Sequence, residues 1–211
     1  MSLGGEARAG RNDAGPRVPL LDVAEMDGAQ RRLHDAVVSG PRGRMIGPLR
    51  AAIHSPELAG LWSQLGEFLR YRTCLPKRLN ELAIVVTGRR WTSQVEWWVH
   101  ARACVEAGMS QAVVDAIEAL APPVFDEAAD VEVYEFARLL QETGQVPADA
   151  YRAVEARWGT RGVVELAAVI GYNTMVSMTL NAHQIPLPEE ATGLPPADGL
   201  VSLAPGRLAG A

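Results

Sequence analysis

The stretch from Pro76 to Ser110 decides the fold of this chain. It consists of PKRLNELAIVVTG (76–88), a basic pair at 89–90, and WTSQVEWWVHARACVEAGMS (91–110). Each half is long and apolar enough to form a buried helix, and a short turn joins the two. The pattern therefore predicts two consecutive core helices, which Gly88 and Gly108 are expected to end.

Three titratable side chains interrupt these two apolar segments. Glu81 lies within the first segment, and Glu96 and His100 lie one helical turn apart in the second. A carboxylate in an apolar helix is costly unless it is paired or serves a function. With Trp97 and Trp98 beside them, the three groups are expected to form the polar part of a small-molecule pocket.

The order of these residues resembles the carboxymuconolactone decarboxylase and alkylhydroperoxidase D superfamily. The peroxidase members of that superfamily carry a Glu followed, twelve residues later, by Cys-x-His-Cys-x-x-x-His. Glu81 and His100 match the outer Glu and His, whereas Ser93, Val95 and Glu96 stand where those members have a Cys, a His and a second Cys. The resemblance therefore implies a thiol-less branch, in which Glu81 and His100 lie within hydrogen-bond distance of each other.

The resemblance extends beyond this stretch, from about Gly47 to Asn181. It includes SPEL at 55–58, AGMS at 107–110 and a late VEL…GYN run that ends at Asn173. It implies a compact multi-helix bundle with the alkylhydroperoxidase D-like fold, and a homo-oligomer, as is usual in the superfamily. Ser93, Trp97, Tyr172 and Asn173 are candidate substrate-binding residues.

Capping residues and prolines predict further helices on both sides of the central pair. They are expected at 22–40, in a short segment ending at 53, and at 55–72, 110–120, 130–143, 147–158 and 160–182. No segment alternates in the manner of a strand, so the fold class is all-α. We expect a disordered N-terminal segment (1–20), a single all-α domain (21–183) and a Pro-rich C-terminal tail (184–211).

Composition narrows the range of partners. The net charge is −5 and the basic residues occur in scattered pairs, which argues against binding to nucleic acid. Cys74 and Cys104 have neither a Cys-x-x-Cys nor a zinc-site spacing, so no metal or other cofactor is expected. No continuous apolar run reaches the ~18 residues of a membrane span, and the chain begins without a signal-peptide pattern. We therefore expect a cytoplasmic protein whose partners are a small-molecule substrate and copies of itself.

Structural interpretations stand beside the functional ones. Ser93 and Glu96 have the spacing of a capping box, so Glu96 can be a helix cap, a pocket carboxylate, or both. His100 can be a hydrogen-bonded core residue, and Glu81 can pair with Arg78 three residues earlier. Trp97 can be a core or interface anchor. Tyr172 and Asn173 can join helices rather than line a cavity.

The leading hypothesis is a cofactor-free lyase or isomerase that acts on a small carboxylated or lactone substrate. His100 transfers the proton, Glu81 orients or stabilises the imidazole, and Glu96 is the second acid–base group. Arg72 and Arg78 are candidates for binding the substrate carboxylate. An alkylhydroperoxidase or peroxiredoxin-type activity is disfavoured because the thiols are missing. The third hypothesis is a non-enzymatic, oligomeric ligand-binding relic in which Glu96 only caps its helix.

Overall fold

The computed structural model describes residues 15–41 and 43–210, so residues 1–14 of the segment expected to be disordered (1–20) lie outside the described range. Val18 and Leu20, from the described part of that segment, pack against a buried cluster. Within the described range, eight α-helices account for most of the chain, as the sequence predicts. They are α1 (Gly28–Ser39), α2 (Leu49–Ala52), α3 (Pro56–Tyr71), α4 (Lys77–Arg90), α5 (Gln94–Glu106), α6 (Gln111–Glu118), α7 (Ala128–Thr143) and α8 (Ala148–His183).

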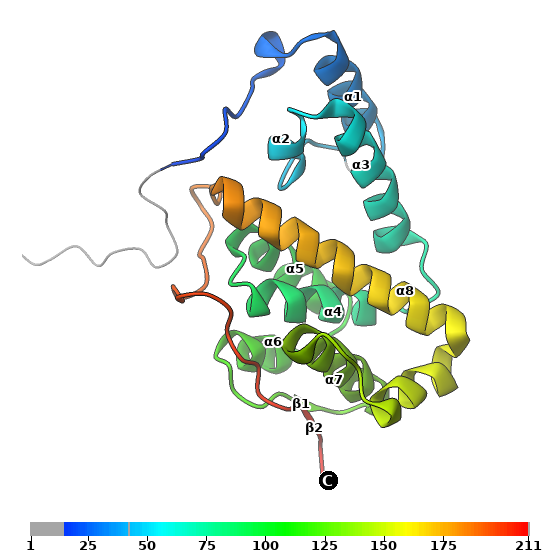
Figure 1. Cartoon of the computed structure of the whole chain (residues 1–211). Helices are drawn as coiled ribbons and strands as arrows, with labels where there is room; N and C mark the ends of the chain where they lie inside the picture. Colours follow the sequence, from blue (N-terminus) through cyan, green and yellow to red (C-terminus); the bar gives the residue numbers. More distant parts are fainter. Residues whose placement is uncertain (1–14, 42, 211) are drawn as a thin grey trace, which may run out of the picture.

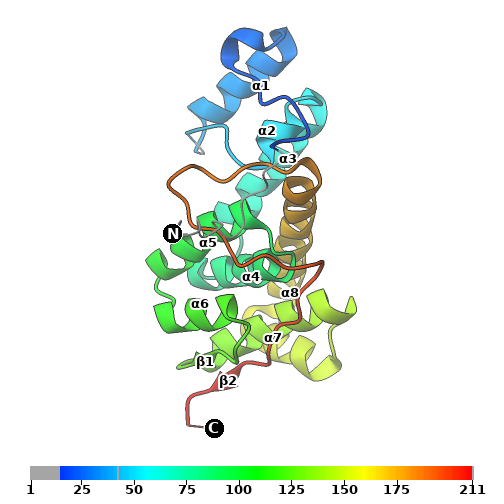
Figure 2. The same cartoon turned by 90° about the vertical axis from the view of Figure 1, so that its left-hand side faces the viewer.

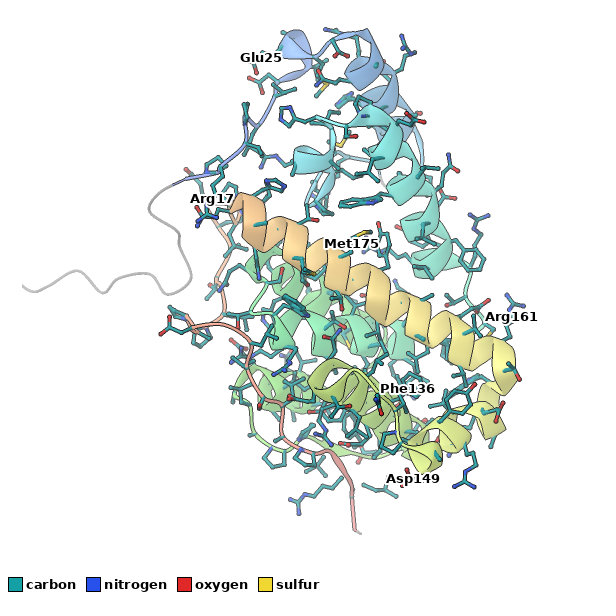
Figure 3. The ribbon with its side chains drawn as sticks, viewed as in Figure 1. Arg17, Glu25, Phe136, Asp149, Arg161 and Met175 are labelled. Carbon is teal, nitrogen blue, oxygen red and sulfur yellow. The ribbon has the colours of Figure 1, made fainter. Side chains whose placement is uncertain are left out.

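The helices form two groups that α8 joins. In Figure 1, α1, α2 and α3 lie on one side of α8, and α4 to α7 lie on the other. Helix α8 contacts α4 and α7 in the second group and α2 and α3 in the first. Figure 3 shows Met175 on the part of α8 that runs beside α2 and α3. The two groups therefore meet along the C-terminal half of α8.

Helix α4 is the centre of the larger group. Every residue from 79 to 90 is buried, and the helix packs against α5, α7 and α8. A helix that is buried all round needs apolar side chains on every face, which explains the continuous apolar run at its centre. Gly88 does not end this helix, contrary to prediction. The helix continues to Arg90, and a Cβ atom at residue 88 would be in van der Waals contact with α5, 3.4 Å from Glu96 Cγ.

The N-terminal helix begins later than the sequence pattern predicts. Asp22 starts only a short 3₁₀ turn, Val23–Glu25. Asp27 caps α1 instead, accepting hydrogen bonds from the backbone N–H groups of Ala29 and Gln30. Two acidic residues thus compete as caps, and the one that bonds two amide groups begins the α-helix.

Helix α8 contains the break that the sequence predicts at Gly159. This glycine has φ 66° and ψ −177°, a backbone conformation that other residues adopt at a cost. By length and composition α8 is the one helix of the described residues that could cross a membrane, with a mean hydropathy of 1.4. The hydropathy is that of an 18-residue stretch of α8, and half of that stretch is buried inside the protein. A core helix of a soluble protein can have the same length and hydropathy.

Part of the surface of α3 is apolar. Leu58, Leu61 and Leu65 lie at helical spacing and have exposed fractions of 45%, 62% and 47%. The homo-oligomer expected from the sequence stays a prediction, because no second chain is present.

The C-terminal segment packs along the second group of helices, where Figure 2 shows it crossing α4 and continuing past α7. Leu194 and Leu203 are buried in the main core. The hydroxyl of Tyr134 donates to the Ala204 carbonyl over 2.7 Å, and a guanidinium N–H of Arg90 donates to the Val201 carbonyl over 2.6 Å. The segment ends in β2 (Arg207–Leu208), which pairs in parallel with β1 (Val124–Phe125). This two-residue pairing has no counterpart in the predicted elements.

We predict that this segment contributes to the stability of the whole domain. Leu203→Ala should lower the free energy of unfolding by ~2–4 kcal/mol, because it removes a buried side chain from the core. The matched control is Leu200→Ala, at a side chain that is 48% exposed, and it should change stability by less than ~0.5 kcal/mol. Urea unfolding monitored by circular dichroism measures both. If both variants lost equally little free energy of unfolding, the C-terminal segment would not unfold cooperatively with the rest of the domain.

Candidate active site

A hydrogen bond between α4 and α5 lies at the centre of the candidate site. His100 Nδ1 is 2.6 Å from Glu81 Oε2. Both residues are buried, with exposed fractions of 7% for His100 and 1% for Glu81. The predicted contact between the two residues is confirmed. The alternative pairing of Glu81 is not seen, because Arg78 bonds Glu127 and Asp130 instead.

The environment of Glu81 determines which imidazole nitrogen is available. Burial alone would raise the pKa of Glu81, but the hydrogen bond and charge of His100, with the charges of Arg70 and Lys77, hold that pKa below its usual range. At neutral pH Glu81 is therefore a carboxylate that accepts the Nδ1–H of His100. In the neutral imidazole this leaves Nε2 without a proton and able to act as a base.

Beside this pair lies a cavity of about 60 Å³. Parts of both helix groups enclose it, so it is formed at their junction. Its lining is mostly apolar. The lining residues are Ile46, Gly47, Pro48, Gly66, Leu69, Arg70, Ile84, Val95, Glu96, Val99, His100, Tyr172, Asn173 and Val176. A small apolar space with a few convergent polar groups is typical of a small-molecule site.

Three of the predicted polar residues reach this cavity together with His100. Glu96 Oε1 is 3.9 Å from His100 Nε2, one helical turn away on α5. The hydroxyl of Tyr172 donates to the Trp62 carbonyl over 3.1 Å and so joins α8 to α3. Asn173 Nδ2 donates to the Val169 carbonyl within α8. Tyr172 therefore both joins helices and lines the cavity, and the two interpretations do not exclude each other.

Two of the predicted substrate-binding residues do not line this cavity. Ser93 is fully buried at the start of α5, outside the lining set. Trp97 is buried in the main core and lines a separate surface groove together with Trp98. For Trp97 the reason is helix geometry, since successive residues lie ~100° apart and Glu96 with His100 occupies one face. The predicted flanking of the site by tryptophans is therefore corrected.

The capping box predicted for α5 is not formed as expected. The side chain of Ser93 makes no cap hydrogen bond to the helix, and within the described residues its buried hydroxyl has no hydrogen-bond partner. Glu96 lines the cavity.

The cation at the cavity is one that sequence reasoning missed. Arg70, on the last turn of α3, lines it. Arg72 is exposed and lies 3.8 Å from Glu67, and Arg78 pairs with carboxylates on the far side of α4, so neither candidate reaches the site. The spacing of Gly66, Leu69 and Arg70 marks one face of α3. That spacing alone does not reveal which helices the face meets.

The loop before α2 also contributes to the site and was not selected from the sequence. Gly47 has φ 59°, in the left-handed region that favours glycine, and Ile46, Gly47 and Pro48 close one side of the cavity. The Gly-Pro pair is visible in the sequence, but its position beside α5 is not.

The two cysteines of this chain do not correspond to the reactive thiol pair of the peroxidases. Cys104 is fully buried, and burial first of all, with the nearby charge of Glu81, raises the pKa of its thiol to about 12. Cys74 is an exposed residue, but partial removal of its thiol from water and the nearby Glu165 raise the pKa of that thiol as well. Raised pKa values keep both thiols protonated and poorly nucleophilic. No group of three or more potential metal ligands is found within the described ranges.

The chain is similar in structure to a protein of known structure. No protein-family model and no curated protein matches the chain. A crystal structure of the debrominase Bmp8, a cysteine-to-alanine variant in complex with 2,3,4-tribromopyrrole, matches with a TM-score of 0.58 at 12% identity. The match covers 86% of this chain and 94% of that one. At this identity it shows the fold alone, and the predicted alkylhydroperoxidase D-like all-α fold is confirmed.

We predict that the contribution of Glu81 to stability depends on pH. Because the folded-state pKa of Glu81 is lowered, its ionised form stabilises the protein above the unfolded-state pKa of ~4.3, and this stabilisation is lost as the pH falls through the folded-state pKa. Glu81→Gln should therefore lower the free energy of unfolding by ~1–3 kcal/mol at pH 7, with a smaller difference from wild type at lower pH. Urea unfolding at several pH values measures this, and the exposed Glu189→Gln is the control. A difference that does not change with pH would contradict the prediction.

We predict that Ser93 does not stabilise α5 as a helix cap, in contrast to Asp27, which caps α1. Ser93→Ala should leave the stability unchanged or raise it, because it removes a buried hydroxyl that has no partner among the described residues. Asp27→Ala is the positive control and should cost ~1 kcal/mol, since Asp27 does cap α1. A loss of ~1 kcal/mol for Ser93→Ala in urea unfolding would restore the cap interpretation.

Proposed function

We propose that this protein is a thiol-less member of the carboxymuconolactone decarboxylase-like superfamily, and that it catalyses a cofactor-free lyase or isomerase reaction on a small carboxylated or lactone substrate. The observation that carries the proposal is the buried Glu81–His100 pair, whose free imidazole nitrogen faces Glu96 beside a small, mostly apolar cavity. A buried carboxylate–imidazole pair beside a cavity is the arrangement that acid–base chemistry requires.

In this proposal His100 Nε2 is the group that exchanges a proton with substrate carbon. Glu81 fixes the tautomer and stabilises the imidazolium when Nε2 accepts a proton. In an isomerase reaction Nε2 removes a proton from one carbon and returns it to another. In a lyase reaction the bond to the carboxylate breaks, carbon dioxide leaves with the electron pair remaining on carbon, and the Nε2–H of the imidazolium protonates that carbon.

Glu96 acts as the second acid–base group. Its carboxyl oxygen is 3.9 Å from Nε2, too far for a direct hydrogen bond. A substrate atom or a water molecule that bonds to both groups can relay a proton between them. The apolar remainder of the lining excludes bulk water, which strengthens the electrostatic interactions of both groups with the substrate.

The structural likeness supports a small substrate. The Bmp8 crystal contains a small planar heterocycle, and a cavity of about 60 Å³ in this chain suits a compact molecule of few heavy atoms. The likeness does not favour a thiol-dependent reaction here, because Cys104 is buried and Ser93 and Glu96 occupy the positions at which the peroxidases have thiols.

The test is solvent-proton exchange into a panel of small lactones and unsaturated carboxylates, followed by proton NMR in deuterium oxide. Exchange at carbon needs no knowledge of the product. Wild-type protein should catalyse exchange or turnover of at least one compound, and His100→Gln and Glu96→Gln should each lower the rate by ~10²–10⁴. Neither change should lower the melting temperature enough to unfold the protein at the assay temperature.

Control variants separate catalysis from folding. Glu106→Gln, at an exposed position on the same helix, should leave the rate unchanged. A Glu96→Gln variant with full activity would remove Glu96 from the mechanism. Peroxide reduction that depends on Cys74 or Cys104 would favour the peroxidase hypothesis instead, and absence of exchange with every compound of the panel would favour the ligand-binding relic.

A further inference from the structure

Arg70 is a cation of the cavity that the proposed chemistry does not yet use. It lies on the last turn of α3 and is half-buried, and its side chain contributes to the same lining as Glu96 and His100. Its guanidinium carbon is 5.6 Å from the centre of the Tyr71 ring. Within the part of the chain that the structure describes, no carboxylate lies within ion-pair distance of Arg70.

Three other arginines that are buried or half-buried are paired with carboxylates. Arg78 bonds Glu127 and Asp130, Arg90 lies 3.3 Å from Glu142, and Arg138 bonds Glu135 over 2.6 Å. Such pairing offsets the cost of partly removing a guanidinium from water. Arg70 interacts with Glu81 only through its charge and makes no direct ion pair with the described residues, which leaves its bidentate hydrogen-bonding groups available to a ligand.

The backbone around Arg70 is held in place. The carbonyl of the preceding Leu69 accepts a hydrogen bond of 2.7 Å from Asn80 Nδ2 on α4. The loop after α3 is fixed to α8, because the Cys74 N–H donates to Glu165 over 2.6 Å. Arg70 is therefore presented to the cavity from a helix end that is attached to two core helices, as a binding residue requires.

Among the lining residues, which also include the carboxyl group of Glu96, Arg70 is the group that favours a negative group on the ligand. Arg70 is the one permanently charged cation among the described lining residues. The charge of Arg70 also acts on the buried Glu81, but the hydrogen-bond partner of Glu81 is His100 and not Arg70. A small cavity with one guanidinium matches one carboxylate, and the apolar lining matches the remainder of the molecule.

We propose that Arg70 binds the carboxylate of a small monocarboxylate and thereby positions the neighbouring carbon at His100 Nε2. The part that concerns His100 rests on the proposed function, whereas the anion site itself does not. Arg70 is then the residue that determines specificity, and it selects a free carboxylate over an uncharged lactone or amide.

The experiment compares two probes that differ in charge but little in shape, 2-furoate and 2-furamide, by isothermal titration calorimetry on the full chain. Wild-type protein should bind 2-furoate more tightly than 2-furamide by ~10-fold or more, because one partner of a charge-assisted hydrogen bond is lost in the amide. Arg70→Gln should weaken binding of 2-furoate by ~10- to 100-fold and leave binding of 2-furamide nearly unchanged. Arg70→Lys should restore part of the preference, since lysine keeps the charge but not the bidentate geometry.

The matched control is Arg72→Gln. It makes the same change in net charge two residues away, at an exposed arginine outside the cavity lining, and it should bind both probes like wild type. Circular dichroism and melting temperature establish that each variant is folded.

Three results would overturn the anion site: wild-type binding of neither probe, equal binding of both probes, or full binding of 2-furoate by Arg70→Gln. His100→Gln distinguishes this proposal from the proposed function, because it should abolish proton exchange and keep the preference for 2-furoate. If wild type shows that preference but catalyses no exchange, the anion site stands and the proposed chemistry fails. If wild type exchanges protons and Arg70→Gln does so at the same rate, the chemistry stands and the anion site fails.

Discussion

The hydrogen bond between Glu81 and His100 is the interaction on which the rest of the site depends. It places a carboxylate in the interior of α4, a helix that is buried along its length from residue 79 to residue 90. A charge in that position is tolerated only with a close partner, and α5 supplies it over 2.6 Å. The packing of α5 on α4 and the orientation of the imidazole are therefore parts of one constraint.

The position of the cavity follows from the way the two helix groups meet. The larger group provides His100 and Glu96, and the smaller one provides Arg70 and the Gly47–Pro48 loop. Helix α8 contributes Tyr172 and Asn173 and links the groups, since the Tyr172 hydroxyl bonds a carbonyl of α3. A change in the angle between the groups would separate the cation from the imidazole. The rigid attachments at Leu69 and Cys74 oppose such a change.

Several features of this chain were accessible from the sequence because they depend on local patterns. Helical periodicity and caps predict most of the helices, and the order of Glu81, Glu96 and His100 indicates both the fold and the polar centre of the site. Local patterns fail where two of them compete. Asp22 and Asp27 both resemble caps, and Gly88 resembles a helix end although α4 continues to Arg90.

The sequence by itself determined an all-α chain with titratable groups on two consecutive helices, because helix formation acts within a few turns of chain. The pairing of Glu81 with His100 was implied by the family resemblance. Only the tertiary structure decided which faces meet. It turned Trp97 away from the cavity, left the Ser93 hydroxyl outside the lining, and brought Arg70 to the site from a helix eleven residues before Glu81. Such placements depend on how helices pack against one another, and that packing is set by side chains that are distant in the sequence.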